Sequence, residues 1–187
     1  IRDVAVTGVQ TCARPIFEAF SYTGGFGILA AHTGAKRVTF LDSSQPALVQ
    51  AAQAAEENGV TDKCEFVKAD AMLELEKRSV NERYDVVVCD PPPFVRAKKD
   101  LEAGARAYRK LARLGATLTA PGGYLLLASC SHNIPVERFA QECAAGIARS
   151  SHTSVALVHQ AGAGSDHPVH PALPETAYLK ALVYRLG

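Results

Sequence analysis

The sequence lacks the features that would assign it to several large classes of protein. No apolar run approaches the roughly 20 residues that a membrane span requires, and no signal peptide is evident. The five cysteines are odd in number and include no C-x-x-C pair, which argues against both a disulfide framework and a zinc site. We therefore expect a cytoplasmic protein with no membrane partner and no bound metal.

An excess of charge of either sign is also missing. The chain has 20 Lys and Arg against 19 Asp and Glu, so no global field attracts polyanions and any basic surface must be local. Hydrophobic residues make up 48% and charged residues 21%, which indicates a globular chain. With 187 residues and no internal repeat, it is long enough for one domain with a sizeable core.

The first 16 residues do not share the regular pattern of the rest of the chain. Thr7-Gly8 and Arg14-Pro15 interrupt any periodicity. The string from Asp3 to Ile16 resembles a translated sequencing adaptor. We expect residues 1–16 to be a non-native leader and residues 17–187 to form the domain, beginning within a strand near Ile16 or Phe17.

The central stretch of the chain is the apolar run Tyr84–Cys89, followed by Asp90 and three prolines. A continuous β-branched run is typical of a strand buried on both faces of a parallel sheet. Proline has no N–H, so the strand must end there. Asp90 is therefore expected on a stiff loop at the carboxyl end of a strand, where open α/β sheets bind ligands. For an isolated strand end, a plain Pro-rich turn is the simpler interpretation.

A glycine-rich turn, Ser21–Gly27, lies between a short strand at Phe17–Phe20 and an apolar helix at about Ile28–His32. Glycine permits a tight turn and close approach of a ligand, and the N-terminus of the helix favours an anionic group. Asp42, which ends the strand Arg37–Asp42, could accept hydrogen bonds from ribose hydroxyls. Together they indicate a nucleotide-like cofactor, although the glycine turn alone is a weak signal.

Strands and helices continue to alternate to the end of the chain. After the strand Cys64–Lys68, Asp70 either contacts an adenine amine or merely caps the helix Ala71–Arg78. Further helices are expected at Asp100–Thr119 and Val136–Ala148, and further strands at Tyr124–Ala128, Thr153–His159 and Tyr178–Arg185. This order predicts an α/β fold with a Rossmann-like, doubly wound, mostly parallel sheet and an antiparallel last strand.

One local basic cluster stands out between Arg96 and Arg113, where seven basic residues face two acidic ones. It includes Lys98 and Lys99. Such a cluster is a candidate phosphate-contacting face. A solvated helix surface is an equally good explanation.

Cys130 comes after the strand Tyr124–Ala128, at the same edge of the sheet as Asp90. A thiolate can add to the sixth carbon of a pyrimidine, which makes the fifth carbon able to take a methyl group from a sulfonium donor. Asp90 could hold or protonate the ring N3 as charge develops there. The alternative for Cys130 is a small buried strand-end residue.

Several motifs, taken together, resemble the bacterial large-subunit ribosomal RNA cytosine-C5 methyltransferase family. They are Phe20–Gly27, Asp90-Pro91-Pro92-Pro93-Phe94, Ser129-Cys130-Ser131, Asp166-His167-Pro168-Val169 and Pro174–Lys180. The resemblance spans Phe17 to the C-terminus and implies a class I, S-adenosylmethionine-dependent fold with a seven-stranded sheet. It also implies ribosomal RNA as the partner and an N-terminal RNA-binding PUA domain, which we expect to be missing from this sequence. Glu18 and His132 depart from the usual Asp and Gly.

By position, the resemblance implies a set of site residues. Cys130 is the expected nucleophile, with Asp90 as the second catalytic residue. The expected cofactor-binding residues are Tyr22, Thr23, Gly24, Gly25, Gly27, Asp42, Ser43, Asp70, Ala71 and Asp90. The expected substrate-binding residues are Pro91, Pro92, Phe94, Lys98 and Lys99.

Three alternatives remain open. Asp90-Pro91-Pro92-Pro93-Phe94 also resembles the loop of amino-group methylases, which need no thiol. Gly25–Ala30 fits the G-x-G-x-x-A fingerprint of a nicotinamide dehydrogenase, but this leaves Ser129-Cys130-Ser131 unexplained. The chain could also be a non-catalytic fragment that binds S-adenosylmethionine.

Overall fold

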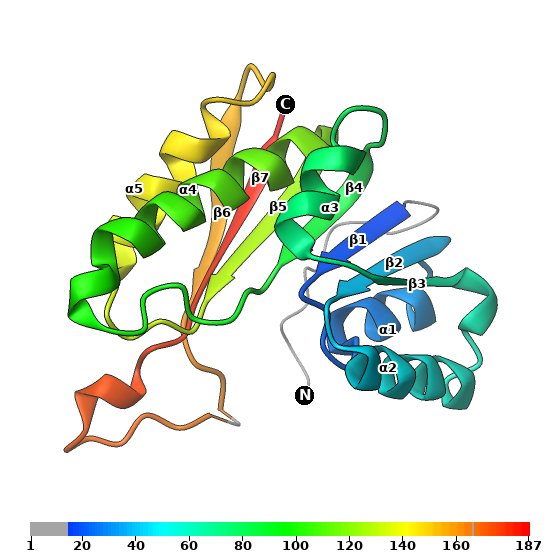
Figure 1. Ribbon diagram of the computed structural model, residues 1–187, viewed down its shortest axis with the longest axis horizontal. Helices are drawn as coiled ribbons and strands as arrows, with labels where there is room; N and C mark the ends of the chain where they lie inside the picture. Colours follow the sequence, from blue (N-terminus) through cyan, green and yellow to red (C-terminus); the bar gives the residue numbers. More distant parts are fainter. Residues whose placement is uncertain (1–14, 166) are drawn as a thin grey trace.

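The computed structural model confirms the doubly wound sheet that the alternation of strands and helices predicts (Figure 1). It describes residues 15–165 and 167–187. The strands are β1 (Pro15–Ala19), β2 (Arg37–Asp42), β3 (Cys64–Lys68), β4 (Tyr84–Cys89), β5 (Thr119–Ser129), β6 (Val155–Ala161) and β7 (Lys180–Leu186). The helices are α1 (Gly25–His32), α2 (Gln45–Glu57), α3 (Ala71–Arg78), α4 (Leu101–Leu118) and α5 (Val136–Ile147), with short 3₁₀ turns η1 (Thr61–Lys63), η2 (Lys98–Asp100) and η3 (Pro174–Thr176).

The seven strands lie in the order β3-β2-β1-β4-β5-β7-β6. The first five strands of the chain pair in parallel, and β7 is antiparallel to both β5 and β6. The antiparallel last strand is as predicted. Its position is not at the edge, however, because β7 lies between β5 and β6 and leaves β6 outermost.

Each face of the sheet has its own hydrophobic core. Helices α1 and α2 pack on one face, around Phe40 and Leu48. Helices α3, α4 and α5 pack on the other, around the fully buried Phe17, Tyr108 and Leu125 (Figure 1). The two cores fix the sheet between two helical layers, and with it the positions of the loops at the carboxyl ends of the parallel strands.

The start of β5 differs from the sequence-based expectation. The Pro-Gly-Gly sequence within Ala120–Gly123 predicts a tight turn before the strand. These residues lie within β5 as a bulge instead: Tyr84 pairs with Thr119, and the next pair joins Val86 to Tyr124. Gly122 has a φ of 79°, which favours glycine.

The expected domain boundary falls inside β1. Pro15 pairs with Arg37 and Ile16 with Val38, so the strand begins before Phe17. Residues 1–14 lie outside the described part of the chain, and their non-native origin stays a proposal. In the part that is described, none of the helices has the length and apolar character to cross a membrane.

Candidate active site

The loops after β1, β2, β4 and β5 meet at one edge of the sheet, because parallel strands all end on that side. The β1–α1 loop is joined directly to Asp42 at the end of β2. The Asp42 carboxylate accepts hydrogen bonds from the backbone N–H of Tyr22 at 2.9 Å and of Ser44 at 2.8 Å. Asp42 therefore shapes the glycine loop, and each of its oxygens keeps a lone pair for a ligand hydroxyl.

The backbone of the β1–α1 loop is held in an unusual conformation. Phe20 and Tyr22 have φ values of 60° and 49°, which non-glycine residues rarely adopt, and Gly24 has a φ of 79°. Such conformations are retained where the surroundings impose them, and they cluster at ligand-binding sites. The loop also exposes the rings of Tyr22 and Phe26, by 68% and 53%, beside the start of α1.

Gly25 and Gly27 differ in what surrounds them. A Cβ at Gly25 would meet no atom within 4 Å, so open space lies before this first residue of α1. A Cβ at Gly27 would lie 2.6 Å from Glu18 Oε2 and would also meet the Phe40 ring. Nearby, the buried Ser21 hydroxyl has no hydrogen-bond partner among the described residues. Open space, an unpaired hydroxyl and the N-terminus of α1 together suit a polar ligand here.

Glu18 is a buried acid beneath this loop, with only 3% of its surface exposed. Its Oε2 accepts a hydrogen bond from Gly27 N–H at 3.0 Å. Burial raises the pKa of Glu18 to about 7, with a smaller contribution from the Asp90 carboxylate, while the backbone N–H groups of Gly27 and Phe26 oppose the rise. From the sequence alone, Glu18 is notable only because it stands where the resembled family usually has Asp, and no role in the site was expected for it.

We expect Glu18 to make stability depend on pH. Its pKa is about 7 in the folded chain, against an ordinary value of 4.5, so the folded state binds the proton more tightly than the unfolded state does. The folded state therefore loses stability as the pH rises from 4.5 to about 7. The loss is about 3 kcal/mol by linkage, or roughly 6–12 °C in Tm for a chain of this size.

Thermal melts of the natural chain and Glu18→Gln at pH 5 and pH 8 measure this effect. Gln cannot titrate, so the Tm of the variant should rise relative to the natural chain as pH increases. A Tm difference that is the same at both pH values would contradict the assigned pKa.

Three further residues of the expected cofactor set lie at this edge, and one of them, Asp70, has a structural role as a helix cap. Asp70 caps α3, because its carboxylate accepts a hydrogen bond from Leu73 N–H at 2.9 Å. Ala71, the first residue of α3, is buried, while Ser43 is exposed directly after Asp42. The capping role expected as the alternative for Asp70 is thus present, and contact with an adenine stays a prediction.

Asp90 stands at the end of β4, where its N–H donates to the Ala19 carbonyl at 3.4 Å. Its side chain is exposed to solvent, yet the protein around it partly desolvates the carboxyl and raises its pKa. Pro91 is buried behind it and Pro92 is exposed. Asp90 thus lies between the β1–α1 loop and the loop that carries Cys130.

The two serines that flank Cys130 anchor its loop to α4. The Tyr108 hydroxyl lies 2.8 Å from Ser129 Oγ and 2.9 Å from Ser131 Oγ, and all three side chains are buried. Ser131 Oγ also accepts a hydrogen bond from Val95 N–H at 3.2 Å. This network fixes the Cys130 loop against the loop after Asp90, which explains why serine stands on both sides of the cysteine.

Cys130 is the half-buried thiol between these serines. Its Sγ lies 3.8 Å from the Pro91 carbonyl oxygen, within hydrogen-bonding reach for sulfur. Cys130 lines a hollow of about 260 Å³, whose other lining residues are His132, Glu175 and Tyr178. Partial burial raises the pKa of Cys130, and the Asp90 carboxylate raises it further, while a backbone hydrogen bond at Cys130 and, less strongly, the Lys180 ammonium lower it.

Cys64, Cys89 and Cys143 lie elsewhere. Cys89 and Cys143 are fully buried, and Cys64 lies at the start of β3. Within residues 15–165 and 167–187, no three or more His, Cys, Asp or Glu side chains gather as a metal site would require.

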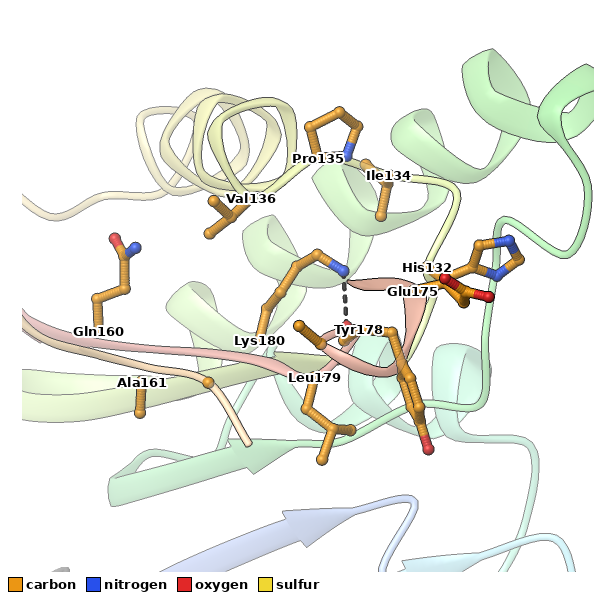
Figure 2. A pocket seen from close by; sticks show the side chains of 12 residues that line it. His132, Ile134, Pro135, Val136, Gln160, Ala161, Glu175, Tyr178, Leu179 and Lys180 are labelled. Atoms are coloured by element: carbon orange, nitrogen blue, oxygen red, sulfur yellow. Dashed lines mark hydrogen bonds between the residues drawn. The ribbon is translucent and has the colours of Figure 1, made fainter. Parts of the chain in front are cut away.

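The loop after β5, the segment before β7 and the first residue of β7 contribute residues for which the sequence alone indicated no role. His132, Glu175, Tyr178 and Lys180 line a second hollow of about 460 Å³ that adjoins the first (Figure 2). The motif Pro174–Lys180 entered the sequence interpretation only through a family resemblance. A lysine at the start of the last strand was the available signal, but its neighbours depend on how β7 pairs.

The expected basic face is only partly available to a ligand. Arg109 pairs with Glu142 at 2.6 Å, and Lys110 and Arg113 pair with Glu76 at 3.3 and 3.7 Å. Lys98 and Lys99, in η2, are exposed, and no ion pair is recorded for them in the described chain. Neither lysine is hydrogen-bonded to the Cys130 loop. Phe94 is half-buried, and its ring centroid lies 4.8 Å from that of Tyr108, so it packs on α4, and its contact with a substrate stays a prediction.

The strand order, the strained glycine loop with its acid on β2, and the Asp-Pro-Pro loop beside a thiol define a Rossmann-like nucleotide-cofactor enzyme. The family model for S-adenosylmethionine-dependent methyltransferases matches residues 4–185. The chain therefore belongs to the S-adenosylmethionine-dependent methyltransferase family, and its cofactor is S-adenosylmethionine.

Curated relatives carry a more specific name. A ribosomal RNA large subunit methyltransferase I of Aeromonas salmonicida is 41% identical over 177 residues, which cover 94% of this chain and 44% of the relative. The protein of the same name from Klebsiella pneumoniae is 39% identical, with 92% and 44% covered. The chain thus spans less than half the length of these relatives.

Solved structures agree with the fold. SMU.776, described as a methyltransferase and crystallised with SAH, superposes with a TM-score of 0.80 at 22% identity, covering 94% of this chain and 46% of that one. TrmN from Thermus thermophilus superposes with a TM-score of 0.62 at 20% identity, covering 94% and 45%. At such identities the likeness concerns the fold.

Proposed function

We propose that this chain methylates the C5 of a cytosine in large-subunit ribosomal RNA through a covalent adduct at Cys130. The observation that carries the proposal is the position of the thiol. Cys130 Sγ lies 3.8 Å from the Pro91 carbonyl oxygen, and Cys130 lines a hollow of about 260 Å³. The name shared by the curated relatives supports ribosomal RNA as the substrate.

In this proposal each residue has a defined task. S-adenosylmethionine supplies an electrophilic methyl group. The Cys130 thiolate forms a bond to C6 of the ring, and the electron pair of the C5–C6 double bond moves toward N3, where Asp90 donates a proton or a hydrogen bond. After C5 is methylated, N3 returns to Asp90 any proton that it took, and C5 loses its own proton to a base. The electron pair of that C5–H bond restores the C5–C6 double bond as the C6–S bond breaks to release the Cys130 thiolate.

S-adenosylmethionine is proposed to bind along the β1–α1 loop, which is hydrogen-bonded to Asp42 at the end of β2. Tyr22, Thr23, Gly24 and Gly25 would surround the methionine part, with Gly27 keeping α1 close to β2. Asp42 and Ser43 would hold the ribose, and Asp70 and Ala71 would border the adenine. The carboxylate of Asp42, already fixed by Tyr22 N–H and Ser44 N–H, is pre-positioned to accept hydroxyl protons.

RNA contact is proposed to begin at the proline loop and η2. Pro91 and Pro92 border the reacting base, and exposed Lys98 and Lys99 approach the phosphates, whereas Phe94 supports the loop through Tyr108. A base in folded RNA must leave its stack to reach Cys130, which costs a few kcal/mol. We propose that an RNA-binding domain, such as the PUA domain the resemblance implies, contributes to that cost in the longer protein.

Trapping with 5-fluorocytosine tests the chemistry. RNA carrying this base, incubated with the chain and S-adenosylmethionine, should yield a methylated covalent adduct, because fluorine cannot leave as the C5 proton does. Mass spectrometry of the digested complex should map the adduct to Cys130.

Two other outcomes have clear meanings. Methyl transfer to ordinary RNA without any adduct would refute the thiol mechanism and favour an amino-group methylase that uses Asp90-Pro91-Pro92. Cofactor binding with neither adduct nor methyl transfer would favour a non-catalytic fragment.

A further inference from the structure

Lys180 is a half-buried cation beside the proposed nucleophile. It is the first residue of β7, and the strand register pairs it with Ser129, the residue before Cys130. Because β7 is antiparallel to β5, the start of β7 meets the end of β5 at the edge that carries the site. Two elements far apart in the chain thereby bring an ammonium group and a thiol to the same place.

The Lys180 ammonium is fixed by backbone carbonyls. Its Nζ donates to the Ser131 carbonyl oxygen at 2.7 Å and to the Tyr178 carbonyl oxygen at 2.7 Å. Figure 2 shows the side chain extending from β7 into the hollow of about 460 Å³, with the Tyr178 hydrogen bond dashed. No carboxylate forms an ion pair with Lys180 in the structurally described residues. Neutral carbonyls hold its charge in place without cancelling it.

We infer that Lys180 is the electrostatic partner of the Cys130 thiolate: its ammonium, held one residue from the cysteine, stabilises the charged sulfur that attacks the base and later leaves it. The significance of this pairing for methyl transfer depends on the proposed function. The pairing itself is a property of the chain without RNA. Since Lys180 acts through Cys130, it is a positioning residue.

The charged and titratable groups around Cys130 determine how strongly its thiolate is favoured over its thiol. Burial and Asp90 raise the pKa of the thiol, whereas a backbone hydrogen bond at Cys130 itself and, to a smaller extent, the Lys180 ammonium lower it. Burial in turn lowers the pKa of Lys180, and a Cys130 thiolate raises it. The groups facing Cys130 from the surrounding elements are Asp90 after β4, Tyr108 on α4, His132 after β5, Glu175 and Tyr178 before β7, and Lys180 on β7.

The test is the pH profile of Cys130 alkylation by iodoacetamide, followed at the Cys130 peptide by mass spectrometry. Only the thiolate reacts, so the midpoint of the profile reports the thiol pKa. Lys180→Gln keeps a hydrogen-bond donor and removes the charge. It should raise the midpoint by about 0.5–1 pH unit and slow alkylation at pH 8 by about threefold to tenfold. Lys180→Arg keeps the charge and should stay close to the natural chain.

Asp90→Asn provides the opposite change. Removing this negative charge should lower the midpoint and speed alkylation at pH 8 by about threefold. Buried Cys89 and Cys143 serve as internal controls, because they stay unreactive while the chain is folded. If Lys180→Gln opens the structure, Lys180→Met, which preserves the packed stem, repeats the measurement.

Two results would overturn the inference. One is a Lys180→Gln profile identical to that of the natural chain, and the other is a Lys180→Arg shift as large as that of Lys180→Gln. Neither depends on RNA. A failed 5-fluorocytosine trap with the expected alkylation shifts would reject the proposed function and leave the Lys180–Cys130 pairing intact. A successful trap with no alkylation shift would support the proposed function and reject the Lys180–Cys130 pairing.

Discussion

Replacing Cys130 with alanine should reduce methylation of large-subunit ribosomal RNA by at least about 10³-fold, equivalent to about 4 kcal/mol of transition-state stabilisation. The reason is that alanine offers no sulfur to add to C6 of the base, so C5 never becomes nucleophilic. Cofactor affinity should stay unchanged, because Cys130 lies at the end of β5 while the glycine loop lies between β1 and α1. Transfer of a radiolabelled methyl group and calorimetric cofactor binding measure the two effects.

Cys64→Ala is the matched control. Cys64 is also a half-buried free thiol, but it lies at the start of β3 with its Sγ 3.2 Å from the Val60 carbonyl, and it should retain full methylation. Undiminished methylation by Cys130→Ala would exclude the covalent route. That result would favour an amino-group methylase, in which Asp90 of the Asp90-Pro91-Pro92 loop contacts an exocyclic amine.

Two alanine substitutions in α1 should have contrasting effects, although they lie two residues apart. Gly27→Ala should destabilise the fold by about 2 kcal/mol, roughly 4–8 °C in Tm, because its Cβ would lie 2.6 Å from Glu18 Oε2 and would also meet the Phe40 ring. Gly25→Ala should leave Tm unchanged, since a Cβ there meets nothing within 4 Å.

Cofactor binding should show the complementary effect. The methyl group of Gly25→Ala would occupy the space that we assign to S-adenosylmethionine and should weaken its affinity about tenfold or more, a loss of about 1.4 kcal/mol. Thermal melting and calorimetry of both variants separate the two effects. Unaltered cofactor affinity in a folded Gly25→Ala chain would place the cofactor elsewhere.

Much of the fold can be derived from local sequence patterns. The strands Arg37–Asp42, Cys64–Lys68 and Tyr84–Cys89 and the helix Ala71–Arg78 have the predicted bounds. Apolar runs, caps and prolines determine these elements within short segments. The bulge at the start of β5 was not predicted, because a Pro-Gly-Gly sequence forms a turn or a bulge according to the strand that it faces.

Only those residues of the candidate site that come at the ends of strands could be predicted from the sequence. Asp42, Asp90 and Cys130 come at the ends of apolar strands and were expected at one edge. Glu18 and Lys180 were not assigned, since their importance comes from burial and from the position of β7 between β5 and β6. The ion pairs within the basic cluster could not be predicted for a similar reason: Glu76 and Glu142, distant in sequence, pair with three of its cations.

The antiparallel course of β7 divides the site into two parts that can change independently during evolution. In the proposed site the methyl donor depends on the β1–α1 loop and on β2, whereas the hollows beside Cys130 are lined in part by the connection between β6 and β7. That connection, residues 162–179, joins two paired strands, and lengthening a loop between paired strands adds only slowly to the free-energy cost of closing it. Insertions or substitutions there could alter the acceptor while leaving the use of the donor intact, so a fold of this kind can acquire new RNA targets without rebuilding its cofactor site.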